Sequence, residues 1–291
     1  MRRRLGLATL GILVATTLTS CGTPESTAGA PTESASPTGA AEPFVPEAGV
    51  CHPEVETVGY RALYTVVDCA KVHRTETVHV GTFTGQHADR LAPPPPGSDP
   101  MRAAFDDCDT RTAAFVGADW RNGLMTIQVV VPEPRDWTAG SRWYRCDVFT
   151  LPALDGVAGY APADLAVERA GTLRGALTKP SPLAHGCFYE DKYKTLEPIP
   201  CTKRHRFEYV GVWTAPDGPY EQVNDDPDAI HDECGTVVAD YVAKAPEATF
   251  PREIGTAYRF PSPQAWERGD RGIRCFYWSP ERNRTRSLLK G

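Results

Sequence analysis

One motif occurs twice in this chain, and each copy starts at a cysteine. Residues 69–80 read CAKVHRTETVHV and residues 201–212 read CTKRHRFEYVGV, with Cys, Lys, His, Arg, Glu and two Val at the same offsets. WTAGSRWYRC at 137–146 and WERGDRGIRC at 266–275 likewise share Trp, Gly, two Arg and Cys. These two pairs of matching segments are unlikely to arise by chance and indicate that the chain contains two copies of one fold.

The cysteines divide into two sets of four that follow the repeat. After Cys21 they are Cys51, Cys69, Cys108 and Cys146, then Cys187, Cys201, Cys234 and Cys275. An even set in an exported protein predicts disulfides, although eight cysteines allow 105 pairings. The order of elements favours an early strand–strand bond and a late helix–strand bond in each copy. We therefore expect Cys51–Cys69, Cys108–Cys146, Cys187–Cys201 and Cys234–Cys275.

Each copy is predicted to be a small α+β domain, an antiparallel sheet with one packed helix and two disulfides. We place the copies at 47–178 and 182–291, joined by the TKPSP segment at 178–182. Copy one has an additional hairpin at 120–123. The two Trp-x-x-Gly segments predict turns, with the tryptophans packed and the following arginines paired to a local acid or carbonyl.

The same order of elements is predicted in both copies. Asp-Pro pairs at 99–100 and 226–227 are typical of a helix N-cap followed by proline at the first helical position. Segments rich in β-branched or aromatic residues predict strands. The expected strands are 64–69, 75–83, 125–131 and 143–149 in copy one, and 196–201, 206–213, 257–260 and 273–278 in copy two.

The N-terminus resembles a bacterial lipoprotein signal. Three arginines precede an apolar run that is short for a permanent membrane span, and the LTSC sequence at 18–21 resembles a lipobox. We expect a signal peptide at 1–20, lipidation of Cys21 and a disordered tether to residue 46. The tether contains no basic residue and almost no large apolar one. The expected location is the extracytoplasmic face of the cell membrane, held by the lipid anchor.

Charge and motifs exclude several function classes. The formal net charge is −6, so nothing in the composition indicates a nucleic-acid partner. The chain contains no Gly-x-Ser-x-Gly, no His-Glu-x-x-His and no phosphate-binding loop. No cofactor is predicted and no catalytic residue is assigned.

The repeated histidines admit several interpretations. Zinc binding would need thiolates that disulfides consume, so no metal site is predicted. A His/Glu pair could do acid–base chemistry, but residues three apart on a strand point to opposite faces. The histidines could instead fix the entry to a hairpin, or the His-Arg pairs could recognise acidic groups of a partner. The candidate binding residues are His73, Arg74, Glu76, His205, Arg206 and Glu208.

These motifs together carry a family resemblance. Cys-x-x-x-His-x-x-Glu, a helical Cys and Trp-x-x-Gly-Asp-Arg-x-x-x-Cys resemble the septum formation domain of actinobacterial envelope proteins. Thr77 and Tyr209 depart from the valine that follows the glutamate in the family pattern. The resemblance covers both copies and implies a role near cell division or envelope biogenesis, without implying catalytic residues.

Three functions remain open on the sequence. The first is a lipid-anchored interaction or scaffold protein with an unknown envelope-protein or cell-wall partner. The second is an envelope enzyme that uses a His/Glu pair. The third is a carrier of a small molecule or lipid, which requires a sizeable cavity within one copy or between the two.

Overall fold

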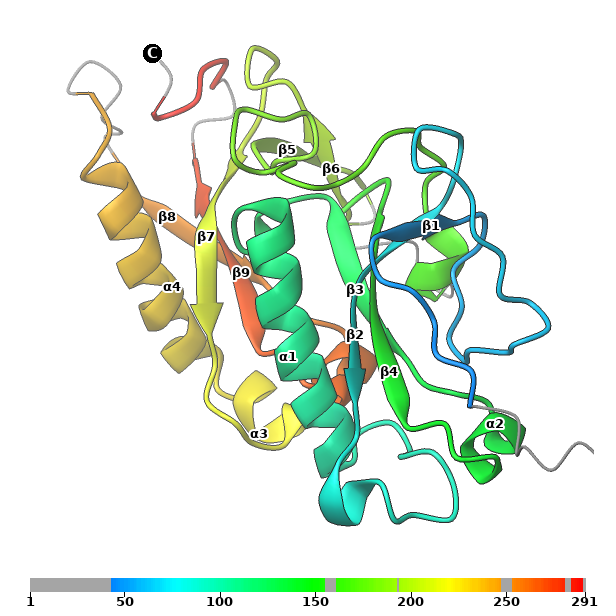
Figure 1. The fold of residues 1–291 in the computed structure, drawn as a ribbon. Helices are drawn as coiled ribbons and strands as arrows, with labels where there is room; N and C mark the ends of the chain where they lie inside the picture. The colour runs from blue at the N-terminus through cyan, green and yellow to red at the C-terminus, as the bar shows by residue number, and fades with distance from the viewer. Residues whose placement is uncertain (1–42, 155–160, 193, 247–252, 281–283, 290–291) are drawn as a thin grey trace, which may run out of the picture. The chain divides into compact units, whose positions relative to one another are not determined.

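Two antiparallel sheets, one from each copy, form the framework of the protein (Figure 1). The computed structural model describes residues 43–154, 161–192, 194–246, 253–280 and 284–289. The predicted signal peptide, the lipidation site Cys21 and the tether up to residue 42 lie outside the described residues. Residues from Pro43 onward group as one unit that contains both sheets.

The first half consists of a four-stranded sheet covered by one long helix. Its strands are β1 (Val50–His52), β2 (Thr75–Thr82), β3 (Met125–Val130) and β4 (Trp143–Thr150), in the order β1-β2-β4-β3. Helix α1 (Asp99–Val116) contacts β2, β3 and β4. The shorter helices are η1 (Gly85–His87), η2 (Trp120–Asn122), α2 (Pro134–Thr138) and η3 (Pro162–Leu165).

The second half repeats this plan and adds one edge strand. Its strands are β5 (Cys187–Glu190), β6 (Leu196–Ile199), β7 (Phe207–Thr214), β8 (Gly255–Arg259) and β9 (Gly272–Trp278), in the order β6-β5-β7-β9-β8. Helix α4 (Pro227–Val242) contacts β7, β8 and β9. The shorter helices are α3 (Tyr220–Asn224) and α5 (Pro263–Arg268). Strands β5, β7, β9 and β8 thus correspond to β1, β2, β4 and β3.

The register of pairing is also repeated. In each half the central pair of strands shifts register at one point, between Thr77 and His79 in β2 and between Tyr209 and Gly211 in β7. Both points lie eight to ten residues after the cysteine that starts the motif. The α+β prediction of two antiparallel units is therefore confirmed, including their internal correspondence.

All four predicted disulfides are present. Cys51–Cys69 joins β1 to the segment before β2, and Cys187–Cys201 joins β5 to the segment before β7. Cys108–Cys146 and Cys234–Cys275 join the long helix to the last strand of its sheet. All four cysteines of the helix–strand bonds are fully buried, so each bond lies within a core.

The strand predicted at 64–69 is wrong. The segment makes only an isolated bridge between Val67 and Cys51, and the Cys51–Cys69 disulfide holds it beside β1. Strand β1 has only three residues, too few to show an alternating pattern in the sequence. The predicted hairpin at 120–123 is likewise wrong, because 120–122 form the 3₁₀ helix η2.

The helix starts were predicted almost correctly. Asp226 is the N-cap of α4, and its side chain accepts a hydrogen bond from the backbone of Ala229. In the first half the N-cap is Ser98, one residue before the predicted Asp99. Pro100 lies in the first turn of α1 as expected.

Each of the two Trp-x-x-Gly segments forms a short helix followed by a tight turn at the glycine. Trp137 in α2 and Trp266 in α5 are buried, and their indole N–H groups donate to backbone carbonyls. Gly140 and Gly269 have φ of 103° and 121°, a conformation that favours glycine. Arg142 stacks on Trp137 and donates to the carbonyls of Trp137, Ser141 and Ala88, as expected for carbonyl partners.

Residues 43–46, placed in the tether by their composition, pack on the first half. The ring of Phe44 lies 5.0 Å from that of Tyr64, and its carbonyl accepts a hydrogen bond from Ser141. Across the described part of the chain, no helix combines the length and apolar character needed to cross a bilayer.

Candidate functional site

The repeated histidines are buried at the start of β2 and β7. His73 and His205 are 1 % and 2 % exposed. In each, Nδ1–H donates to a carbonyl two residues earlier, Lys71 or Lys203, at 2.8 Å. The backbone of each also pairs across to an arginine, Arg169 or Arg284. Each histidine therefore fixes the entry to its strand, while its other ring nitrogen is buried without a hydrogen-bond partner.

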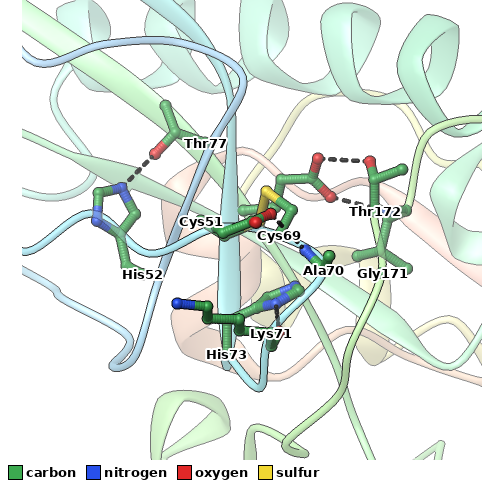
Figure 2. The surroundings of a disulfide bond; sticks show 12 residues. Cys51, His52, Cys69, Ala70, Lys71, His73, Thr77, Gly171 and Thr172 are labelled. Carbon is green, nitrogen blue, oxygen red and sulfur yellow. Dashed lines mark hydrogen bonds between the residues drawn. A yellow bond between two sulfur atoms is a disulfide. The ribbon is translucent and has the colours of Figure 1, made fainter.

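The glutamates of the motif bind a later segment of the same half. Glu76 accepts hydrogen bonds from the Thr172 hydroxyl at 2.6 Å and the Leu173 backbone N–H at 2.8 Å (Figure 2). Glu208 accepts from the Tyr241 hydroxyl at 2.7 Å and the Leu288 N–H at 2.9 Å.

We call these later segments straps and define them as residues 169–173 and 284–288. In the second strap the Ser287 hydroxyl also donates to Glu208. Leu173 and Leu288 are buried at the end of each strap. The buried carboxylates are thus occupied by strap donors and are not paired with the histidines of their own motif.

The straps are a third repeated segment that motif reasoning missed. RAGTL and RTRSL share arginine in the first position, a hydroxyl residue in the fourth and leucine in the fifth. Three matches in five residues at different distances from the preceding cysteine are hard to see without the structure. The shared chemistry is clear once each glutamate is seen to hold the fourth and fifth positions.

The two candidate arginines lie beside the histidines and are partly exposed. Arg74 pairs with Glu54 at 2.9 Å and donates to the carbonyl of Ala166. Arg206 stacks on Trp278, with its guanidinium carbon 4.7 Å from the ring, and donates to the Ser279 carbonyl. Both have partners within their own half, and both keep some solvent access for a binding partner.

Cysteine sulfur and carboxylate atoms gather at both motifs, joined in the second by a histidine nitrogen. Potential ligand atoms of Cys51, Cys69 and Glu76 lie within 4.8 Å of one another. In the second half those of Cys187, His205 and Glu208 do the same. All of these cysteines are in disulfides, and a disulfide sulfur is not the thiolate that zinc requires. The arrangement therefore does not fit a zinc centre.

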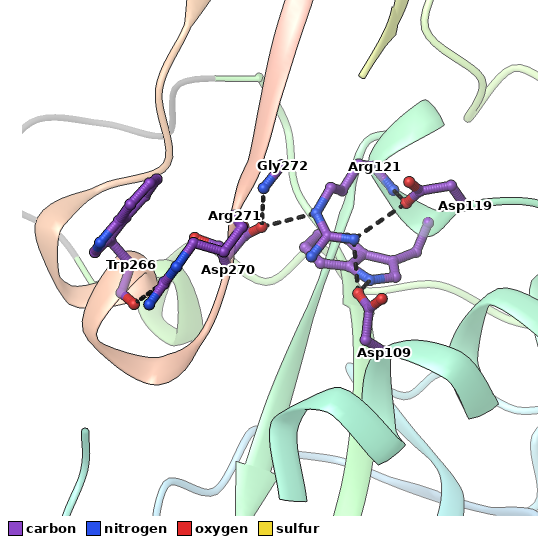
Figure 3. Close-up of polar contacts among 8 residues, drawn as sticks. Asp109, Asp119, Arg121, Trp266, Asp270, Arg271 and Gly272 are labelled. Carbon is purple, nitrogen blue, oxygen red and sulfur yellow. Dashed lines mark hydrogen bonds and ion pairs between the residues drawn. The ribbon is translucent and has the colours of Figure 1, made fainter. Parts of the chain in front are cut away.

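A different set of residues joins the two halves, and it centres on Arg121 in η2. Its side chain is 8 % exposed and faces three carboxylates (Figure 3). Asp109 and Asp119 come from the first half, at 2.6 and 3.4 Å, and Asp270 comes from the second half at 2.7 Å. Burial opposes the charge of Arg121, but the three aspartates together raise its pKa above the usual value.

Other contacts complete this junction. The Tyr209 hydroxyl donates to the Asn122 side chain at 2.7 Å, which ties β7 to η2. A side chain at Gly269 would meet Phe105 of α1 at 3.0 Å, so glycine permits close packing of the halves there. The His185 backbone N–H donates to the Asn122 carbonyl at 2.8 Å, and its ring packs on Tyr209 of the same half, with ring centres 4.8 Å apart. The segment at 120–123 therefore supplies several of the contacts between the halves, alongside the packing of Phe105 near Gly269.

A cleft of about 710 Å³ opens beside this junction. Residues 123–126, at the start of edge strand β3, form part of its wall, and residues 259–265, from the end of β8 into α5, form another. Its charged lining residues are Arg259, Arg268, Asp270 and Arg274. A volume between about 300 and 1,000 Å³ is typical of small-molecule sites. A smaller hollow of about 400 Å³ lies beside His205.

Burial and charge act on the groups around the cleft. Burial holds the pKa of His185 well below its usual value, and the charge of Arg274 lowers it further. His185 is therefore a neutral imidazole, and both of its ring nitrogens are buried without a hydrogen-bond partner. Burial also lowers the pKa of Arg268, against the opposing effect of Asp270.

The comparison with known proteins gives one family and no individual relative. A family model described as septum formation matches residues 48–275, which run through both halves and include all eight paired cysteines. No curated protein and no solved structure matches the chain. The matched segment is more than half of the 291 residues. The chain belongs to the septum formation family.

Proposed function

We propose that this protein is a lipid-anchored, extracytoplasmic interaction protein that serves septum formation or a related step in building the cell envelope. The family match through both halves carries the proposal, because membership indicates a role in division or the envelope. The family is not known as one of enzymes. Two tandem copies on one anchored tether would also allow two contacts with a repeated or multi-subunit partner.

The arrangement of the motif residues supports an interaction role over an enzymatic one. A general acid or base must reach a substrate proton, and Glu76 and Glu208 are 3 % and 2 % exposed and bonded to the straps. Arg74 and Arg206 keep solvent access at equivalent places in the two halves. We propose these arginines as contacts to acidic groups of an envelope-protein or cell-wall partner.

The anchor is tested first. Cells that express the full chain are fed an alkyne analogue of palmitate, and the protein is examined for label. We expect label and a membrane location for the native chain, and neither for Cys21→Ala. An unlabelled native chain that begins at Met1 would reject the lipid anchor.

The role is tested by placing the protein in dividing cells. A fluorescent fusion of the native chain should collect at septa, and chemical crosslinking should recover envelope proteins or cell-wall fragments in excess of the Cys21→Ala control. Arg74→Glu with Arg206→Glu should reduce that recovery while the four disulfides still form. Even labelling of the whole envelope, with nothing recovered beyond the control, would reject the proposal.

A further inference from the structure

The last strand of the first sheet carries a buried arginine with two acid partners, although its Nη1 is buried without a hydrogen-bond partner. Arg145 in β4 is 0 % exposed. It donates to Asp147 at 2.9 Å and to Glu56 at 2.9 Å. The Thr77 hydroxyl donates to the same aspartate at 2.7 Å. Burial opposes the charge, but Asp147 and then Glu56 raise the pKa of Arg145.

Arg274 is the counterpart of Arg145 in the second half. Each immediately precedes the core cysteine of its last strand. Each pairs with the valine eleven residues after the motif cysteine, Val80 or Val212. The two arginines therefore occupy one position of the repeated fold.

The acids that hold Arg145 have no counterpart beside Arg274. The position of Asp147 is taken by Phe276, and that of Thr77 by Tyr209, which pack together in an aromatic cluster. The chain after β5 continues into the β5–β6 hairpin and supplies no counterpart to the loop that carries Glu56. The second half therefore has the arginine, Arg274, but an aromatic residue, Phe276, where the first half has the carboxylate of Asp147.

Arg274 faces the cleft between the halves instead of an internal acid. It lines the 710 Å³ cleft, and its Nε is buried without a hydrogen-bond partner. Its guanidinium carbon lies 5.8 Å from the ring centre of Trp120, a contact that leaves the N–H groups free. Among the described residues, no ion pair includes Arg274 or Arg268, which lines the same cleft.

The other charges of the cleft are already matched. Asp270 is paired with Arg121, and Arg259 lies 3.6 Å from Glu190. Among the described residues, the cleft therefore presents two guanidinium groups that form no ion pair, Arg274 and Arg268, beside a neutral imidazole. Leaving a partly buried cation without an anion is costly, which points to an anion supplied from outside.

The rest of the cleft wall is apolar, which indicates that the anionic group of the ligand is attached to an apolar body. Leu124, Leu151, Leu154, Leu165 and Phe260 line the cleft together with these cations. A guanidinium and a carboxylate form a short, charge-assisted and often bidentate pair. The internal anions of Arg145 are carboxylates, so the position is shaped for that group.

We propose that the cleft between the two halves binds a small organic carboxylate with an apolar body, and that Arg274 and Arg268 hold its carboxylate. The inference goes beyond the proposed function and does not depend on it. A protein that crosslinks to no envelope partner could still bind such a ligand, and the reverse is equally true.

Octanoate is the test ligand and octanamide its uncharged match. The full-length chain with Cys21→Ser is used, so that no attached lipid can compete for the cleft. Calorimetry and ligand-observed NMR should show saturable binding of octanoate to one site, and octanamide should bind about tenfold more weakly or worse. Arg274→Gln should weaken octanoate about tenfold or more, and Arg274→Lys by less. Arg111→Gln, which removes an exposed arginine of α1, is the matched control and should bind normally.

Thermal unfolding gives a second readout that does not depend on the ligand chosen. Without ligand, Arg145→Gln should lower the melting temperature by several degrees, because Asp147 loses its partner. Arg274→Gln should leave the melting temperature unchanged or raise it. Equal binding of octanoate to the native chain and Arg274→Gln, or no binding of octanoate at all, would overturn the proposal. A melting temperature that falls as far in Arg274→Gln as in Arg145→Gln would also count against it.

Discussion

At the scale of single residues, the repeated motif holds the fold together. The sequence predicted the histidines at the mouth of a hairpin. That hairpin does not form, because 64–69 is not a strand and β6 pairs with β5, and His73 and His205 lie at the start of β2 and β7 instead. The sequence could not place the partners of Glu76 and Glu208, because the straps follow nearly a hundred residues later in one half and about eighty in the other. Such distances leave no periodic signal, so only the fold brings carboxylate and strap together.

We predict that Glu208→Gln lowers the free energy of unfolding by about 2 to 3 kcal/mol. The glutamine NH₂ would face the donors of Tyr241, Ser287 and Leu288, where the carboxylate accepts. Urea unfolding at pH 7 measures the loss. Glu221→Gln in α3 removes an exposed carboxylate and should change the value by less than about 0.5 kcal/mol. Similar losses in both variants would show that Glu208 does not hold the strap.

We also predict that stability falls as the pH drops from 6.5 toward 5. Burial, and then Arg274, depress the pKa of His185 in the folded state, so the unfolded chain takes up the proton first. Each such group contributes a slope of at most about 1.4 kcal/mol per pH unit. Within the part of the chain that the structure describes, Arg274 and Tyr209 are the ionisable groups found to act on or pack against His185.

His185→Phe keeps a ring against Phe188 and Tyr209 and removes the titrating group. The slope of unfolding free energy between pH 6.5 and 5 should become smaller. It should not vanish, because burial also lowers the pKa of His52, partly offset by Asp147. An unchanged slope in the variant would assign the acid sensitivity to other groups.

At the scale of elements, the strands and helices with strong patterns were predictable, and the short or irregular ones were not. Helix α4 was expected from the Asp-Pro start and the spacing of apolar residues, and it buries Ile230, Cys234, Val238 and Val242 on one face. The segment at 64–69 has strand-forming residues, but a disulfide and one bridge hold it as an irregular loop. Local preference there is overridden by a covalent bond.

The disulfides should differ in their contribution according to the loop they close. Cys234–Cys275 closes 41 residues and Cys187–Cys201 closes 14. Restriction of the unfolded chain predicts about 4 kcal/mol for the first and about 3 kcal/mol for the second. Paired alanine variants of each bond, compared by urea unfolding, should differ by about 1 kcal/mol. A larger loss for the shorter loop would mean that packing around Cys187 outweighs chain entropy.

At the scale of the whole molecule, the cleft and the junction arise from differences between the two halves. The sequence showed an additional segment at 120–123 without revealing its purpose. Arg121 of this segment pairs with Asp270, which is 149 residues away in the sequence. No sequence pattern in either segment predicts that ion pair. The elements that occur in both halves could therefore be predicted by comparing the two copies. The residues that join the halves occur only once, so no such comparison was possible for them.

The junction gives the last prediction, which concerns the coupling of the two halves. Arg121→Met leaves Asp270, 6 % exposed on its side chain, without its partner and should cost about 3 to 5 kcal/mol. Asp119→Asn alters a longer, more exposed contact of the same arginine and should cost less than about 1 kcal/mol.

Because η2 is where Arg121 and Asn122 reach the second half, Arg121→Met should also separate the urea transition of the native chain into two. Hydrogen exchange of peptides from β4 and from β9, measured by mass spectrometry, follows the two halves separately. A single transition with an unchanged midpoint in Arg121→Met would show that the halves are coupled by packing around Phe105 and Gly269, and not by this ion pair.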